Sequence, residues 1–282
     1  MLKMIDFHVH VDGFAWKEFE LASMCGVDIL ITAAYYPHKV EVTTSKILDS
    51  IEKIIVYDSW RAGMHSIKLF AGIGINPMSI PKDYNDFLQK MPRLFDKDSV
   101  VAIGEVGLDP RSETCTDMQI QIDILKKELE IAKELMKPVF IHIPPTGVTG
   151  VLEKDWKSYK NTKKILAKDI EIIKESKIDH DLILFDHLDE SVIEIVLNQG
   201  FNAGITVQPW RGMSPTRASS IIKKFEHEYK RLFINSDFSD TLESDCLAVP
   251  KTAKRMREIG ISEDKIDSII WKNPLRFFKL RI

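Results

Sequence analysis

The chain has 282 residues, with 39 Lys and Arg against 42 Asp and Glu, so its formal net charge is −3. Hydrophobic residues make up 44% and charged residues 29%, which is typical of a folded globular protein and excludes disordered and collagen-like chains. Three cysteines, none of them in a C-x-x-C pair, exclude a disulfide framework and a cysteine-based zinc knuckle.

Eight short apolar runs alternate with longer charged segments along the chain. Most of the runs are continuously apolar, as expected of parallel strands that are covered on both faces. The runs are residues 4–10, 27–36, 67–75, 100–107, 138–143, 182–187, 201–208 and 231–237. We therefore predict eight parallel strands.

The segments between the runs predict amphipathic helices. Residues 122–136 place apolar side chains at spacings of three and four, with Lys and Glu between them. Residues 162–175 predict a further helix, and the last helix is expected over residues 261–271. Because proline cannot continue a helix, we expect that last helix to end before Asn273 and Pro274.

The spacing of the runs predicts how the strands are arranged. The 227 residues from His10 to Asp237 cover seven units, a mean of about 32 residues, and a strand–helix–strand repeat needs roughly 30. The pattern predicts a single (β/α)8 TIM barrel over residues 1–282, with residues 146–159 as a loop over its mouth. An open, doubly wound sheet stays as the alternative, because periodicity cannot show closure.

Polar side chains stand at or near the ends of several predicted strands, where barrel enzymes carry their active sites. His8 and His10 are two residues apart on the first strand, so both rings face the same side. Later strand ends carry Glu105, His142, His187 and Asp237. Each residue alone is compatible with a structural role, but the combination predicts a metal site.

The ligand types narrow the choice of metal. Imidazole and carboxylate without thiolate indicate Zn, Mn, Fe, Co or Ni. Six candidate ligands exceed the three that one catalytic zinc uses, so we expect two divalent metal ions bridged by a carboxylate and a hydroxide. Asp6 is expected on the same face as His8, where it would orient a histidine.

Longer motifs surround these residues. They are D-F-H-V-H at 6–10, G-E-V-G-L-D at 104–109, P-V-F-I-H at 138–142, His187, the pair Ser236-Asp237, and N-P-L-R-F-F at 273–278. With these motifs the whole chain resembles the amidohydrolase superfamily and, within it, the TatD-like metal-dependent hydrolases. The resemblance implies two metal ions with Glu105 between them. The first would be held by His8, His10 and Asp237, and the second by His142 and His187.

Three stretches depart from the TatD pattern. TatD nucleases usually carry His-Pro-His after strand three, where this chain has Asn-Pro-Met at 76–78. They carry Cys-Phe-x-Gly after the strand-six histidine and Glu-Thr-Asp on strand eight, where this chain has Leu-Asp-Glu at 188–190 and Asn-Ser-Asp at 235–237. The sequence therefore indicates a divergent TatD-related branch, and the metal site is better supported than nuclease activity.

The predicted activity is metal-dependent hydrolysis, with a phosphoester as the expected substrate. Two cations would activate a bridging water, Glu105 would hold them together, and Asp237 would take up the proton. Two alternatives remain. The same site would suit an amidase, a lactonase or another ester hydrolase, and a barrel of this kind can also be a non-catalytic metal-binding scaffold protein.

Side chains that follow other strands are candidates for substrate contact, with ordinary loop packing as the alternative for each. They are Tyr36, Asn76, Arg111, Gln208, Trp210 and Arg211. The expected partner is a small molecule or a phosphoester. A nucleic acid remains open, although the charge balance does not indicate one. No apolar stretch approaches the ~20 residues of a membrane span, and the N-terminus lacks a signal-peptide pattern, so we expect no membrane partner and a cytoplasmic location.

Overall fold

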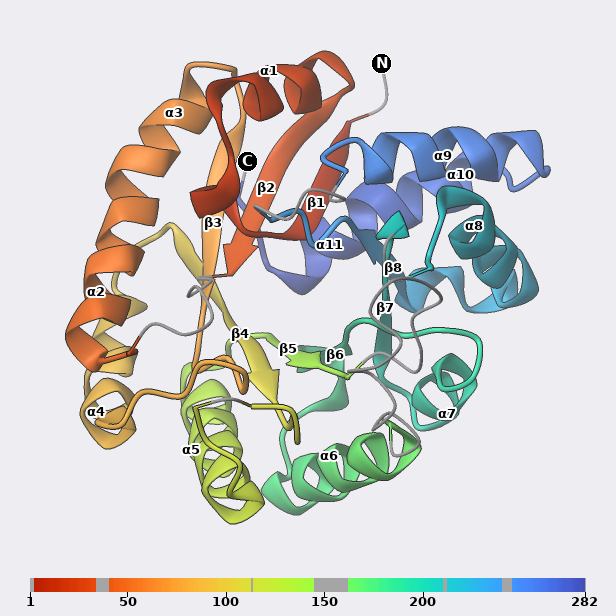
Figure 1. Ribbon diagram of the computed structural model, residues 1–282. Helices are drawn as coiled ribbons and strands as arrows, with labels where there is room; N and C mark the ends of the chain where they lie inside the picture. Colours follow the sequence, from red (N-terminus) through yellow and green to blue (C-terminus); the bar gives the residue numbers. More distant parts are fainter. Residues whose placement is uncertain are drawn as a thin grey trace.

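The structure is a computed structural model that describes residues 3–33, 41–112, 114–144, 162–209, 212–239 and 245–281. Its parallel strands follow one another around a single sheet in the order β1 to β8 (Figure 1). The strands are β1 (Met4–Val9), β2 (Val27–Ala33), β3 (Lys68–Ile73), β4 (Val100–Gly107), β5 (Val139–His142), β6 (Ile183–Phe185), β7 (Asn202–Thr206) and β8 (Leu232–Asn235).

The sheet closes between its first and last strands. Val9 forms an isolated parallel bridge with Phe238. The backbone N–H of Asp237 donates to the carbonyl of His8 at 2.8 Å, and that of His10 donates to the carbonyl of Phe238 at 2.7 Å. The predicted (β/α)8 TIM barrel is therefore confirmed, and the open-sheet alternative is excluded.

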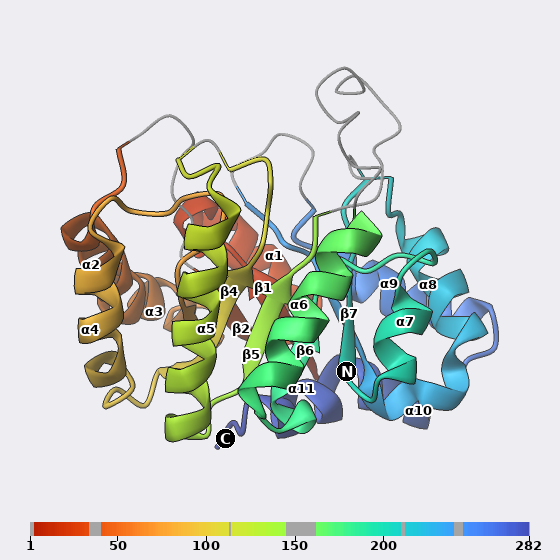
Figure 2. The ribbon, with the colours of Figure 1, turned by 90° about the horizontal axis from the view of Figure 1, so that it is seen from below.

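Helices surround the barrel and cover the outer face of the sheet (Figures 1 and 2). They run antiparallel to the strands (Figure 2). The α-helices are α1 (Trp16–Met24), α2 (Thr44–Lys53), α3 (Ser59–Gly63), α4 (Tyr84–Leu94), α5 (Met118–Leu135), α6 (Thr162–Ser176), α7 (Ile193–Asn198), α8 (Pro215–Lys224), α9 (Ala248–Glu258), α10 (Glu263–Asp267) and α11 (Asn273–Phe277). Short 3-10 turns are η1 (Val11–Gly13), η4 (His180–Leu182) and η6 (Glu226–Arg231), and π-helical turns are η2 (Ile54–Asp58) and η7 (Ser268–Lys272).

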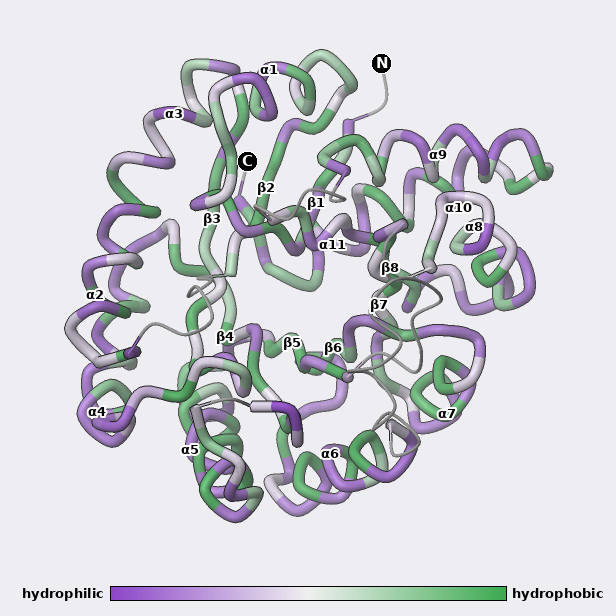
Figure 3. The backbone as a smooth tube through the Cα atoms, viewed as in Figure 1, coloured by the Kyte–Doolittle hydropathy of each residue, from purple (hydrophilic) through white to green (hydrophobic). Residues whose placement is uncertain are grey.

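The helices match the sequence patterns that predicted them. In α5, Leu125, Leu129 and Ala132 are buried against the sheet, while its lysines face outward. Figure 3 shows the same alternation of hydrophobic and hydrophilic residues along the helices. None of the helices in the described ranges is long and apolar enough to cross a membrane. The predicted loop over residues 146–159 lies outside the described residues.

The prediction that the last helix ends before Asn273 is wrong. The helical path continues from α10 through η7 into α11, which contains Pro274 at its start. A proline is tolerated there because the first turn of a helix needs no backbone donor. Phe277 and Phe278 then pack in one buried cluster with Phe7, Phe140 and Phe233, and α11 lies at the end of the barrel opposite the strand C-termini (Figure 2).

A bulge in β1 brings His8 onto the aromatic side chains of the barrel interior. The consecutive residues Phe7 and His8 both face the interior: the Phe7 ring lies 5.8 Å from that of Phe233, and the His8 ring lies 5.3 Å from that of Phe140. The pairing of β1 with β2 shifts register between Asp6 and Val9, which is how two neighbouring side chains reach the same side. His8 therefore rests on a layer of aromatic rings.

Candidate metal centre

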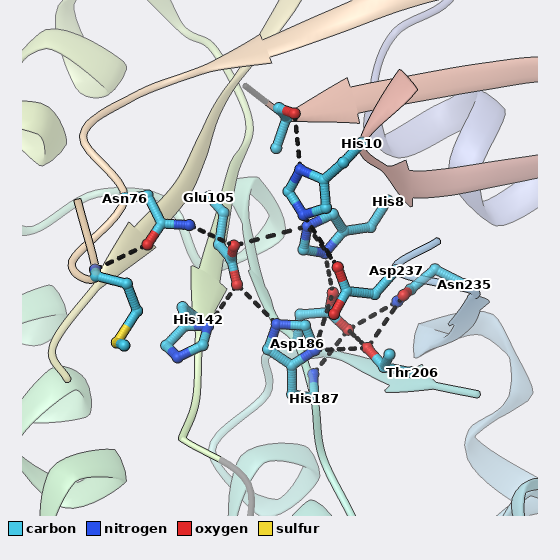
Figure 4. Close-up of polar contacts among 12 residues, drawn as sticks. His8, His10, Asn76, Glu105, His142, Asp186, His187, Thr206, Asn235 and Asp237 are labelled. Carbon is cyan, nitrogen blue, oxygen red and sulfur yellow. Dashed lines mark hydrogen bonds and ion pairs between the residues drawn. The ribbon is translucent and has the colours of Figure 1, made fainter. Parts of the chain in front are cut away.

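The six predicted ligand residues lie together at the C-terminal end of the barrel, and all are buried (Figure 4). His8, Glu105 and His142 belong to β1, β4 and β5, and His10, His187 and Asp237 follow the ends of β1, β6 and β8. Ligand-type atoms lie within 4.8 Å of one another in three overlapping groups, which include His8, His10 and Glu105 in one and Glu105, His142 and His187 in another.

Glu105 occupies the middle of the cluster. Its Oε1 lies 2.7 Å from Nε2 of His187 and contacts Nδ1 of His142. Its Oε2 accepts a hydrogen bond from Nδ2 of Asn76 at 2.9 Å and lies 3.7 Å from Nε2 of His8. One carboxylate thus faces histidines from three different strands.

Asp237 faces the other side of the cluster. Its Oδ1 lies 3.0 Å from Nε2 of His10 and 3.7 Å from Nε2 of His8. Asp237 and His187 both have a positive φ, 44° and 61° respectively, which is uncommon for residues other than glycine. Such backbone strain concentrates at functional sites, where it aims a side chain that a regular strand end would direct elsewhere.

Each histidine has one ring nitrogen bound to a fixed partner, which leaves the other nitrogen for the centre. Nδ1 of His8 lies 2.7 Å from Oδ2 of Asp186, and Nδ1 of His10 lies 2.9 Å from the carbonyl of Ala33. Nδ1 of His187 lies 2.6 Å from the hydroxyl of Thr206. With a metal ion bound, each of these partners would accept the proton of Nδ1, so that Nε2 would offer its lone pair to the ion.

His142 is arranged the opposite way. Its Nε2 lies 2.9 Å from Oδ2 of Asp109, and its Nδ1 faces Glu105. Arg111 in turn binds Asp109, through Nε to Oδ1 at 2.9 Å and through Nη2 to Oδ2. Burial favours the neutral form of Asp109, but His142 and Arg111 outweigh it and lower the pKa of that carboxyl to about 2.

The charges of the cluster are strongly coupled. Burial alone would lower the pKa of His8, but the carboxylates of Glu105 and Asp237 raise that pKa to about 9. Burial is likewise outweighed at His142, where Glu105 and Asp109 raise the pKa to about 9. Burial opposes the charge on Glu105, yet His142 and His8 hold the pKa of that carboxyl well below its ordinary value. Protons on His8 and His142 therefore neutralise the negative charge of the carboxylates, and a bound metal cation could neutralise it in their place.

The cluster fits a divalent cation. Nε2 of His8 is buried and has no hydrogen-bond partner among the described residues, although its ring is held firmly through Nδ1. A buried polar atom without a partner is costly, and a metal ion would supply the missing partner. Imidazole and carboxylate donors without thiolate suit transition metals of the zinc and manganese kind.

The residues predicted to contact substrate have different fates. Asn76 is buried and binds Glu105, and its Oδ1 accepts from the backbone N–H of Met78 at 2.8 Å. Arg111 lies beside His142, with Nη2 3.4 Å from Nε2. Gln208 is buried and donates to the carbonyl of Asp237. Tyr36, Trp210 and Arg211 lie outside the described residues.

The expected role of Asp6 is wrong. Its Oδ1 accepts from the backbone N–H of Ser236 at 3.0 Å, and the carboxylate that holds a histidine ring is Asp186 instead. The bulge in β1 separates the side-chain direction of Asp6 from that of His8, so the two-residue period does not apply across it. Sequence reasoning also missed Thr206 and Asn235; the available signal was a polar residue inside an otherwise apolar strand.

Comparison with known proteins shows the family of the chain. The model of the family described as TatD related DNase matches residues 5–279. An uncharacterised metal-dependent hydrolase of Methanocaldococcus jannaschii is 30% identical over 277 residues, which cover 98% of this chain and all of that protein.

Solved structures show the same fold. The TatD-like protein of Archaeoglobus fulgidus superposes with a TM-score of 0.76 at 23% identity, over 98% of this chain and 100% of that one. A β-aspartyl dipeptidase of Fervidobacterium islandicum gives a TM-score of 0.70 at 18% identity, over 99% of this chain and 73% of that one. With the family match across its length and this cluster of ligand-type side chains, the chain belongs to the TatD family of metal-dependent hydrolases.

Proposed function

We propose that the protein hydrolyses phosphoesters with a centre of two divalent metal ions. The observation that carries the proposal is the position of Glu105, whose two oxygens face separate sets of histidines. His8, His10 and Asp237 would hold one ion, His142 and His187 would hold the other, and Glu105 would bind both. A carboxylate shared in this way is a common arrangement of two-metal hydrolases.

Divalent ions in such a site lower the pKa of a water molecule and polarise the bond to be broken. The residues of the chain supply the remaining steps. Oδ1 of Asp237 lies beside the rings of His10 and His8, so its carboxylate can take up a proton released in the cluster. The hydrogen bond from Gln208 to the Asp237 carbonyl keeps this residue in place.

The proposed substrate class rests on two observations. The matching family is described as TatD related DNase, whose substrate is a phosphodiester. Arg111 also lies at the cluster with a partly exposed side chain, where its guanidinium can contact an anionic oxygen. The net charge of −3 does not oppose this class, because cations bound at the cluster would neutralise the phosphate locally.

A panel of substrates tests the proposal. The protein, purified without chelator and reconstituted with Mn²⁺ or Zn²⁺, is assayed on bis(p-nitrophenyl) phosphate, p-nitrophenyl phosphate, a lactone and a β-aspartyl dipeptide. We expect metal-dependent cleavage of a phosphoester and a large loss of rate in Asp237→Asn. Cleavage of only the lactone or the dipeptide would reject the substrate class. No turnover of any substrate by the metal-loaded protein would favour a non-catalytic scaffold.

A further inference from the structure

Asp186 is a fully buried carboxylate directly after β6 that no sequence motif singled out. Figure 4 shows it among His187, Thr206 and Asn235, below His8 in this view, where several polar contacts meet. Its two oxygens face hydrogen-bond donors of His8, His187 and Asn235. This residue is therefore a buried acceptor next to the candidate metal centre.

One oxygen of Asp186 holds His8. Oδ2 lies 2.7 Å from Nδ1 of the His8 ring, and this contact fixes both the ring orientation and the position of its proton. Nε2, which has no hydrogen-bond partner among the described residues, then faces the centre, where it would offer its lone pair to a metal ion. In the proposed assignment, His8 belongs to the half of the centre that also contains His10 and Asp237.

The other oxygen of Asp186 serves the opposite half. Oδ1 accepts from the backbone N–H of His187 at 2.7 Å and from Nδ2 of Asn235 at 2.8 Å, and it lies 3.2 Å from the hydroxyl of Thr206. That hydroxyl is the partner of His187 Nδ1 at 2.6 Å. Because the hydroxyl can donate to Asp186 or to Oδ1 of Asn235 at 3.0 Å, it remains an acceptor for the His187 ring.

The barrel leaves room for this carboxylate. A Cβ added to Gly204, on the neighbouring strand β7, would lie 2.6 Å from Oδ1 of Asp186. Glycine at this position lets the carboxylate sit against the strand and reach both histidines. The surroundings of Asp186 are formed by β6, β7 and β8 together, because Thr206 and Asn235 are the last residues of β7 and β8.

We propose that Asp186 is a positioning residue that orients one histidine in each half of the centre and thereby couples the binding of the two metal ions. This inference rests on the proposed two-metal function and extends it to a residue outside the ligand set. A change at Asp186 should weaken both halves. Of the two histidine rings, the Thr206 hydroxyl contacts that of His187, so a change at Thr206 should weaken one half.

The isosteric variant Asp186→Asn tests the proposal, because it keeps the shape of the side chain and replaces one acceptor oxygen by a donor group. All the groups that face Asp186 are hydrogen-bond donors, whereas an amide has one acceptor oxygen and one donor nitrogen. If the amide oxygen serves the three donors on the Oδ1 side, its NH₂ group faces Nδ1 of His8. The ring must then accept at Nδ1 and carry its proton on Nε2, which blocks a metal ion from that nitrogen. The neutral amide oxygen also holds the His187 side more weakly than a charged carboxylate oxygen does.

The test is a calorimetric titration of the metal-free protein with Zn²⁺, with metal content measured by elemental analysis. We expect two binding steps in the wild type and a loss of about 10–100-fold in the affinity of both steps in Asp186→Asn. Thr206→Val should weaken one step, and Thr206→Ser, which keeps the hydroxyl, should restore it. Glu128→Gln is the control for replacing a buried carboxyl by its amide, because Glu128 lies on α5 and accepts from the backbone N–H of Ile75, just beyond β3.

A spectroscopic readout separates positioning from loss of structure. In zinc-loaded protein labelled with ¹⁵N-histidine, the Nδ1–H of His8 should give a protected, downfield proton signal, assigned by its absence in His8→Gln. We expect Asp186→Asn to shift or remove this signal while the circular dichroism spectrum stays unchanged.

The outcomes distinguish the two proposals. Two zinc ions per chain in both the wild type and Asp186→Asn, with equal affinities, would reject the role of Asp186 and leave the two-metal centre intact. Weakening of only one step would reject the coupling. A single zinc ion in the wild type would instead reject the two-metal centre, whatever the variant does.

Discussion

Oδ2 of Asp109 lies 2.9 Å from Nε2 of His142, so His142 turns its Nδ1 toward Glu105 while the other three histidines of the cluster turn Nε2 toward the centre. Asp109 is fully buried, and its second oxygen is occupied by Arg111. The orientation of His142, on β5, therefore depends on a carboxylate that follows the end of the neighbouring strand β4.

The first prediction concerns this pair. In Asp109→Asn, an NH₂ group replaces an oxygen that accepts from His142 or Arg111, so the ring loses its fixed orientation. We expect one zinc-binding step to weaken by about 10–100-fold, with the other step unchanged. Calorimetric titration measures both. Equal weakening of the two steps would show that Asp109 supports the whole cluster rather than His142.

The second prediction concerns the pH dependence of metal binding. Nearby carboxylates raise the pKa values of His8 and His142 to about 9 in the metal-free protein, so both rings hold an extra proton at pH 7. Metal binding must displace these protons, and the affinity should rise as the pH rises from 7 to 9. Titrations in buffers of different ionisation enthalpy count the protons released. Binding at pH 7 without proton release would contradict the account.

The third prediction concerns Glu128 on α5, whose Oε1 accepts from the backbone N–H of Ile75 at 2.7 Å. Burial raises the pKa of Glu128 from 4.5 to about 8. Between these values the folded protein holds a proton that the unfolded chain has lost, so this group lowers the free energy of unfolding as the pH rises, by roughly 1 kcal/mol per pH unit.

Glu128→Gln removes this dependence. Urea unfolding at pH 5 and pH 8 should therefore show that the variant gains stability relative to the wild type as the pH rises. A constant difference between the two proteins over this range would be incompatible with a protonated, buried Glu128.

The fold and the clustering of the six candidate ligands were both predictable from the sequence, for related physical reasons. Buried parallel strands read as continuous apolar runs, and a barrel brings the ends of its strands together, so His142 and His187 could be grouped despite their distance along the chain. The resemblance to TatD-like hydrolases then divided the grouped residues between two proposed metal positions.

The residues that hold the candidate ligands through hydrogen bonds could not be predicted in this way. Asp186 and Asp109 act through hydrogen bonds to side chains far away in the sequence, which no local pattern reports. The two-residue period of a strand predicts that Asp6 faces the same side as His8 and orients a histidine, and the bulge in β1 breaks that period. The last helix is predicted to end before Pro274, since proline often stops a helix. Proline also fits the first turn of a helical segment, as it does in α11.

The central claim is that Glu105 joins two metal positions, and counting metal ions tests it most directly. Elemental analysis of the zinc-reconstituted protein should give two ions per chain in the wild type. Glu105→Gln should give fewer than one ion per chain, because an amide has a single, uncharged oxygen where the carboxylate offers two charged oxygens facing separate histidines. One ion per chain in the wild type, or two ions retained by Glu105→Gln, would contradict the account.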